Sequence, residues 1–138
     1  MKKRLIEYSI LFILGGLIYG LIEIMARGYT HWSMVLVGGL CFLIVGALNE
    51  VMSWDLAITS QMLIGAISIT IIEFIAGCIL NLWLGWNIWD YSELPYNLLG
   101  QICLTHSCYW FLLSLAAILV DDYCRYWFFK EEKPKYKL

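Results

Sequence analysis

Two glutamates inside long apolar stretches are the residues of this sequence whose position most suggests chemistry. Glu23 lies one helical turn before Arg27, whereas Glu73 has no basic residue one turn away. An ionisable group inside a membrane is costly, so each carboxyl group is a candidate cation or proton site. The alternative interpretation is structural: Glu23 pairs with Arg27 near the membrane surface, and the glutamates are either hydrogen-bonded or extend outward to the membrane surface.

Small and polar side chains recur at helical spacing around both glutamates and in the last apolar stretch. In lipid such faces turn toward one another. They predict either a polar cavity that opens outward and contains both glutamates, or packing contacts between helices, and the sequence leaves both open. The three predicted stripes are Gly16, Tyr19, Gly20 and Glu23; Thr59, Ala66, Thr70, Glu73 and Gly77; and Asn97, Gln101, Thr105 and Cys108.

The sequence contains none of the common catalytic or nucleotide-binding patterns. It lacks G-x-x-x-x-G-K-[ST], G-x-S-x-G, H-E-x-x-H and C-x-x-C, so we expect no ATP hydrolysis by this chain, no catalytic residue and no cofactor. Cys103, His106 and Cys108 come nearest to a metal cluster, but on one helix they would not share a face. We therefore expect no metal site.

Membrane-spanning helices are the elements that must position these residues. Hydrophobic residues make up 62% of the 138 residues and charged residues 14%, against roughly 45–50% and 25% in soluble domains. Four apolar stretches, at about residues 5–26, 34–52, 56–82 and 98–120, are long enough to cross a bilayer, which takes about 20 residues. We expect an all-α polytopic integral membrane protein, with residues 1–138 forming a single transmembrane domain built as a four-transmembrane-helix bundle.

Lysine and arginine concentrate at the two ends of the chain, and Arg27 is the one exception. The positive-inside rule then predicts a multi-pass protein of the cell membrane with both termini in the cytoplasm. We expect a charged C-terminal tail at about residues 125–138, and we expect the part after Phe129 to be frayed. The net charge of −2 gives no reason to expect a nucleic-acid partner, and the lipid bilayer is the partner that composition implies.

The connection between the third and fourth apolar stretches, residues 83–97, is rich in aromatic side chains. Gly85 and Pro95 interrupt helix there, and three Trp and two Tyr suit the membrane–water boundary. We expect a Trp-rich interfacial loop or short helix that caps the outer end of the bundle. Its motif residues are Trp86, Trp89, Asp90, Tyr91, Ser92 and Pro95.

Two segments of the sequence resemble a known family. Residues 71–81, I-I-E-F-I-A-G-C-I-L-N, and residues 89–104, W-D-Y-S-E-L-P-Y-N-L-L-G-Q-I-C-L, are similar to the bacterial type IV ABC-transporter permeases. Y-G-L-I-E in the first apolar stretch agrees, so the resemblance covers about residues 10–125. The resemblance implies a permease-like transport component of unknown substrate. It also implies a separate ATPase subunit and a homo-oligomer, because such permeases usually contribute more spans per chain.

The resemblance adds Asn81 to the residues that could form a substrate or ion pathway. Two other functions stay open: a small secondary carrier or ion channel that uses the intramembrane glutamates, and a non-transporting membrane scaffold or accessory subunit. The candidate pathway residues are Glu23, Glu73, Thr70, Asn81, Asn97, Gln101 and Thr105.

Overall fold

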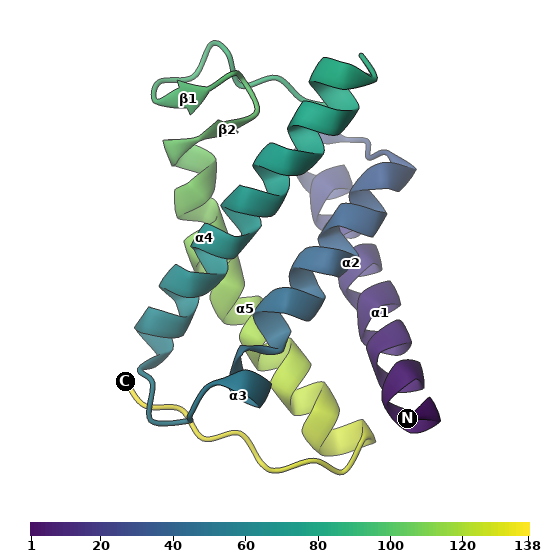
Figure 1. The fold of residues 1–138 in the computed structure, drawn as a ribbon, viewed down its shortest axis with the longest axis vertical. Helices are drawn as coiled ribbons and strands as arrows, with labels where there is room; N and C mark the ends of the chain where they lie inside the picture. The colour runs from purple at the N-terminus through teal and green to yellow at the C-terminus, as the bar shows by residue number, and fades with distance from the viewer.

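The computed structural model describes residues 1–138 and consists of four long helices with one irregular loop at the end opposite the N-terminus (Figure 1). The four helical segments Lys2–Arg27, Trp32–Val51, Ile58–Trp83 and Leu104–Phe128 are each long and apolar enough to cross a membrane. The prediction of an all-α, four-transmembrane fold is therefore confirmed. We call the end that holds residues 28–31 and 84–103 the loop end, and the opposite end the terminal end.

The helices pair in chain order. Helix α1 (Lys2–Arg27) packs along α2 (Trp32–Gly46), helix α4 (Ile58–Gly77) packs along α5 (Leu104–Phe128), and α2 contacts both α4 and α5. Close approach in the first pair depends on Gly16, because a Cβ there would overlap the Val35 carbonyl oxygen. Gly28 ends α1 in the left-handed conformation, with φ 84°, and its N–H donates to the Ile24 carbonyl.

The second and third spans each end in a distinct short element. Helix α3 (Leu48–Val51) follows α2 at the terminal end and completes the second span. The last turns of the third span form a π-helix, η1 (Cys78–Trp83), in which the Leu84 N–H donates to the Ile79 carbonyl at 2.9 Å. The apolar core nearest the terminal end contains Val45, Leu48, Ile58, Met62 and Ile118.

The fourth helix begins at Leu104 rather than near Leu98, which corrects the expected start. Strands β1 (Asn97–Leu98) and β2 (Ile102–Cys103) pair antiparallel before it. The turn between them has left-handed backbone at Leu99 (φ 55°) and Gly100 (φ 71°), which a helix cannot contain. Hydropathy does not separate such a short apolar hairpin from the first turns of a helix.

The C-terminal tail is held against the bundle, so the expectation of a frayed tail is wrong. Helix α5 runs to Phe128, and the tail beyond it crosses the terminal end. The Ile58 N–H donates to the Lys137 carbonyl at 2.7 Å, and the Tyr136 hydroxyl donates to Asp122 Oδ2 at 2.8 Å. Burial, together with the Asp122 carboxylate, raises the pKa of Tyr136 above its ordinary value, which keeps this hydroxyl a donor.

Candidate functional site

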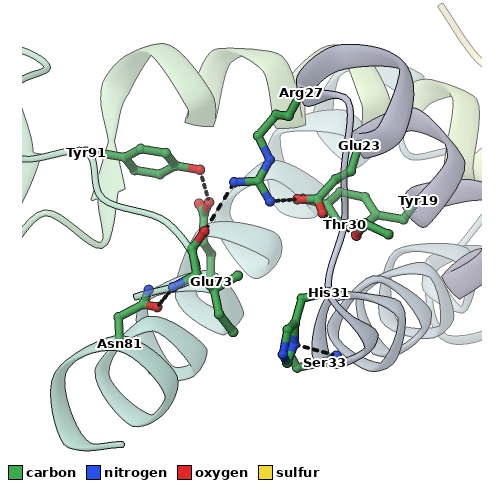
Figure 2. Close-up of polar contacts among 10 residues, drawn as sticks. Tyr19, Glu23, Arg27, Thr30, His31, Ser33, Glu73, Asn81 and Tyr91 are labelled. Atoms are coloured by element: carbon green, nitrogen blue, oxygen red, sulfur yellow. Dashed lines mark hydrogen bonds and ion pairs between the residues drawn. The ribbon is translucent and has the colours of Figure 1, made fainter. Parts of the chain in front are cut away.

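Glu73 lies on the face of α4 that points into the bundle, and only 6% of its surface is exposed. The Tyr91 hydroxyl donates to Oε1 at 2.9 Å, and the Trp110 indole N–H donates to Oε2 at 2.8 Å. Figure 2 shows Tyr91 reaching Glu73 from the loop. No ion pair of the structure includes Glu73. The carboxyl group is thus satisfied by two neutral donors from two different elements and has no cationic partner.

Glu23 is held by an ion pair that also reaches the loop. Arg27 Nη2 donates to Glu23 Oε1 at 3.1 Å, and the Thr30 hydroxyl donates to Oε2 at 2.6 Å. The second terminal nitrogen of Arg27, Nη1, donates to the Ile88 carbonyl at 3.2 Å. The ion pair that the sequence suggested is present, and Arg27 additionally connects α1 to the loop.

Asn81 and Gln101 fix the loop to the π-helix. Asn81 Nδ2 donates to Gln101 Oε1 at 2.8 Å, and Asn81 Oδ1 accepts from the Ile88 N–H at 2.7 Å. The Trp89 indole donates to the Gln101 carbonyl at 2.9 Å. Gly77 makes this contact possible, because a Cβ there would lie 2.6 Å from Gln101 Oε1. The polar groups of these side chains bind other parts of the protein, so in this structure they hold the loop in place.

The other candidate pathway residues do not lie together. Thr70 shares a 2.9 Å hydrogen bond with Ser107, which joins α4 to α5. Asn97 accepts from the Gly100 N–H at 3.0 Å and donates to the Leu94 carbonyl at 2.8 Å, both within the loop. Thr105 is exposed, as is Cys108. The predicted inward stripe from Asn97 to Cys108 is therefore wrong, because it assumed one continuous helix.

The residues of the loop motif divide into buried and exposed groups. Trp89 is buried at 7% exposure, while Trp86 packs against the Trp32 ring with centroids 5.8 Å apart. The Ser92 N–H donates to Asp90 Oδ1 at 2.9 Å and lowers the pKa of that exposed carboxyl group. Burial and the neighbouring Glu73 raise the pKa of the Tyr91 hydroxyl. Pro95 and Ser92 are exposed.

A cavity of about 450 Å³ lies beneath the loop, between α1 and α5. Glu23, Arg27, Tyr91 and Trp110 are among its lining residues. A second, smaller cavity of about 120 Å³ contains Glu73 and shares Tyr19, Ile22, Met34, Trp110 and Leu113 with the first. The two cavities therefore adjoin: Glu23 borders the larger part, and Glu73 borders the smaller, deeper part, which extends toward Val120.

The sequence did not reveal Trp110 as a partner of Glu73. A tryptophan in the middle of an apolar stretch needs an acceptor for its indole N–H when it is buried, and that is the signal that could have found it. His106 stacks on the Tyr91 ring with centroids 4.1 Å apart, and its Nδ1 lies 3.1 Å from Cys103 Sγ. Because Cys103 belongs to β2, the assumption that these residues share one helix was wrong.

A second polar cluster, at the terminal end, was also not predicted as a site. Arg125 is only 3% exposed and donates to Asp121 Oδ2 at 2.7 Å. Asn49 donates to Asp122 Oδ2 at 2.5 Å, which joins the end of the second span to α5. A Cβ on Gly46 would overlap the Asp121 carboxyl group, so a glycine is needed where α2 meets this cluster.

The family described as "Putative ABC-transporter type IV" matches residues 2–135 of the chain. The chain belongs to this family. The match includes all four spans and the loop, and it confirms the resemblance seen in the sequence. No curated protein and no solved structure matches the chain. As a member of an ABC-transporter family with four apolar helices, the protein is a multi-pass membrane protein consistent with a transport component.

Proposed function

We propose that this protein is the membrane-spanning component of a transport system and that its solute-binding region is formed by the two adjoining cavities. Family membership and four membrane-spanning helices support a transport role. The larger cavity lies between α1 and α5, which belong to different helix pairs and pack mainly on other partners.

The observation that carries the proposal is the buried carboxyl group of Glu73. It borders the deeper part of the cavity and forms no ion pair. An ionisable group in the apolar part of a membrane is costly and typically marks a substrate or ion pathway. The buried carboxyl group without a cationic partner therefore supports a role in binding a solute or an ion.

We further propose that both termini are cytoplasmic, which places the cavity at the outer side of the cell membrane. Eight of the nine Lys and Arg residues lie near the two ends of the chain, and positive charge favours the cytoplasm. The sequence has no phosphate-binding loop, so ATP hydrolysis would come from a separate ATPase subunit. Four spans per chain further favour a homo-oligomer as the transporting unit.

Purification from native membranes after mild cross-linking tests this proposal. Mass spectrometry of the purified complex should find a stoichiometric ATPase and cross-links between copies of this chain. Recovery of the protein alone, or only with copies of itself, would contradict the ATPase part. Recovery with a different membrane protein and no ATPase would favour an accessory or scaffold role.

A secondary carrier or channel is the second candidate, because Glu73 could itself bind and release a cation or proton. The Glu73→Gln variant separates the two functions in liposomes that contain only this protein. A carrier or channel should show ion flux that this substitution abolishes while the protein remains folded. If the wild-type protein shows no flux without an added ATPase, the carrier interpretation is wrong.

A further inference from the structure

Aromatic rings surround the larger cavity on several sides. Tyr19 comes from α1, Trp89 and Tyr91 from the loop, and Tyr109 and Trp110 from α5. Tyr19 and Trp110 also border the deeper part, and their ring centroids lie 6.1 Å apart at the junction of the two spaces. The faces of aromatic rings attract cations, and several rings together form the sites that proteins use for quaternary ammonium groups.

Glu73 is the one carboxyl group around this space without a cationic partner. Glu23 is paired with Arg27 at 3.1 Å, so these two charges offset each other. Arg27 is further held by the Ile88 carbonyl, which directs it to the loop. Glu73 has only neutral donors, Tyr91 and Trp110. In a medium of low dielectric constant an uncompensated carboxylate attracts a cation far more strongly than it would in water.

The walls of the deeper part select for an apolar molecule. Ile18, Ile22, Leu113, Ala117 and Val120 line it between α1 and α5. These side chains offer no hydrogen bonds, so a strongly hydrated ion would lose its water there without replacement. The larger cavity, about 450 Å³, falls within the range of roughly 300–1,000 Å³ in which proteins bind small molecules.

We propose that this cavity binds a lipophilic organic cation, such as an aryl or alkyl ammonium or phosphonium ion. Its charged centre lies against the contacting rings of Tyr19 and Trp110, on the side of Glu73, and its apolar groups extend along the apolar walls of both cavities. The statement that this cation is the transported substrate rests on the proposed function. Binding itself does not require transport and is tested separately.

Tetraphenylphosphonium and tetraphenylborate are suitable probes because they have nearly the same shape and opposite charge. Equilibrium dialysis of the purified full chain in neutral detergent, corrected with empty micelles, measures the binding of each. The wild-type protein should bind the phosphonium ion saturably and at least about tenfold more tightly than the borate ion. Glu73→Gln should weaken phosphonium binding at least about tenfold, and the Glu93→Gln control, which removes an exposed loop carboxyl group, should not change it.

The Tyr109→Leu variant keeps the test decisive if Glu73→Gln fails to fold. Tyr109 lines the cavity and is 52% exposed, so its replacement leaves the core intact. It should weaken phosphonium binding by roughly two- to fivefold, the contribution of one cation–π contact. Equal binding of both probes, no saturable binding, or binding unaffected by either variant would overturn the inference. Specific binding without a copurifying ATPase would support the ligand class and contradict ATP-driven transport.

Discussion

The Trp110→Phe substitution removes one hydrogen bond to Glu73 and keeps an aromatic ring in place. The lost bond is the 2.8 Å contact from the indole N–H to Glu73 Oε2. Trp110 is 8% exposed and Glu73 is 6% exposed, so both partners are buried. A hydrogen bond to a charged group contributes about 1.5–3 kcal/mol in soluble proteins. Measured values inside membranes average about 0.6 kcal/mol and reach about 1.7 kcal/mol. Because both partners are buried, we expect Trp110→Phe to destabilise the protein by about 1–2 kcal/mol.

A double-mutant cycle separates this hydrogen bond from the packing of the ring. In a Glu73→Leu background the indole N–H has no acceptor, so only the loss of ring packing remains, and Trp110→Phe should cost about 1 kcal/mol less there than in the wild type. Reversible unfolding in bicelles with increasing denaturing detergent measures the free energy of unfolding of the four proteins. The expected coupling energy between the two positions is about 1 kcal/mol.

Trp127→Phe is the matched control, because Trp127 is 66% exposed and is not a hydrogen-bond partner of Glu73. It should change the free energy of unfolding by less than about 0.5 kcal/mol. Equal costs of Trp110→Phe in both backgrounds would refute the reasoning. Trp110 would then act through ring packing alone.

Three further substitutions test other parts of the structure. Gly46→Ala should destabilise the protein by about 1–3 kcal/mol, measured by the same unfolding assay, because the new Cβ overlaps the buried Asp121 carboxyl group. Gly100→Ala should loosen the loop, measured as faster hydrogen exchange in residues 88–103, because φ is 71° there and the new Cβ would lie 2.7 Å from Asp90 Oδ1. Tyr136→Phe should release the tail, measured by limited proteolysis, because the bond to Asp122 is lost. Since the pKa of Tyr136 is raised on folding, this bond stabilises the wild-type tail below the unfolded pKa of about 10 and is lost as pH rises further.

Each of these substitutions has a control and a contradicting result. Gly20→Ala places its Cβ 3.3 Å from a Val35 methyl group and should be tolerated better than Gly46→Ala; equal effects would contradict the Asp121 contact. Gly85 has a similar φ of 68°, but a Cβ there would have no neighbour within 4 Å. Equal hydrogen exchange of the loop in Gly85→Ala and Gly100→Ala would mean that backbone strain alone loosens it. If the tail of the Tyr136→Phe variant stays protected from proteolysis, the backbone contact of Lys137 is sufficient to hold it.

The four spans could be predicted because hydropathy is summed over about 20 residues and one misplaced residue changes little. The hairpin at residues 97–103 could not be predicted in the same way. Leu98, Leu99 and Ile102 are as apolar as a helix would require, and only the backbone angles separate the two structures. The error at this point moved Thr105 to the wrong side of the helix and produced a stripe that does not exist.

The site was partly predictable for a related reason. Glu23 and Glu73 stood out because carboxyl groups are rare in apolar stretches, and each borders one of the two adjoining cavities. Their partners depend on how the loop folds back over the bundle, which no local pattern encodes. Tyr91 reaches Glu73 from 18 positions away and Trp110 from 37. Asp121 and Arg125 are four residues apart, a spacing that predicts an ion pair on a helix. The pair was not predicted because the expected fourth helix ended at about residue 120.

Uptake of radiolabelled tetraphenylphosphonium into native membrane vesicles is the decisive measurement, because a transport role requires Glu73 to face a moving solute. Inside-out and right-side-out vesicles with equal amounts of wild-type or Glu73→Gln protein are compared with and without ATP on the cytoplasmic side, with the membrane potential collapsed. We expect ATP-dependent accumulation in wild-type vesicles of one orientation and at least about a tenfold lower rate in the variant. Equal rates in wild-type and variant vesicles would contradict a transport role for Glu73 and leave it as a packing residue.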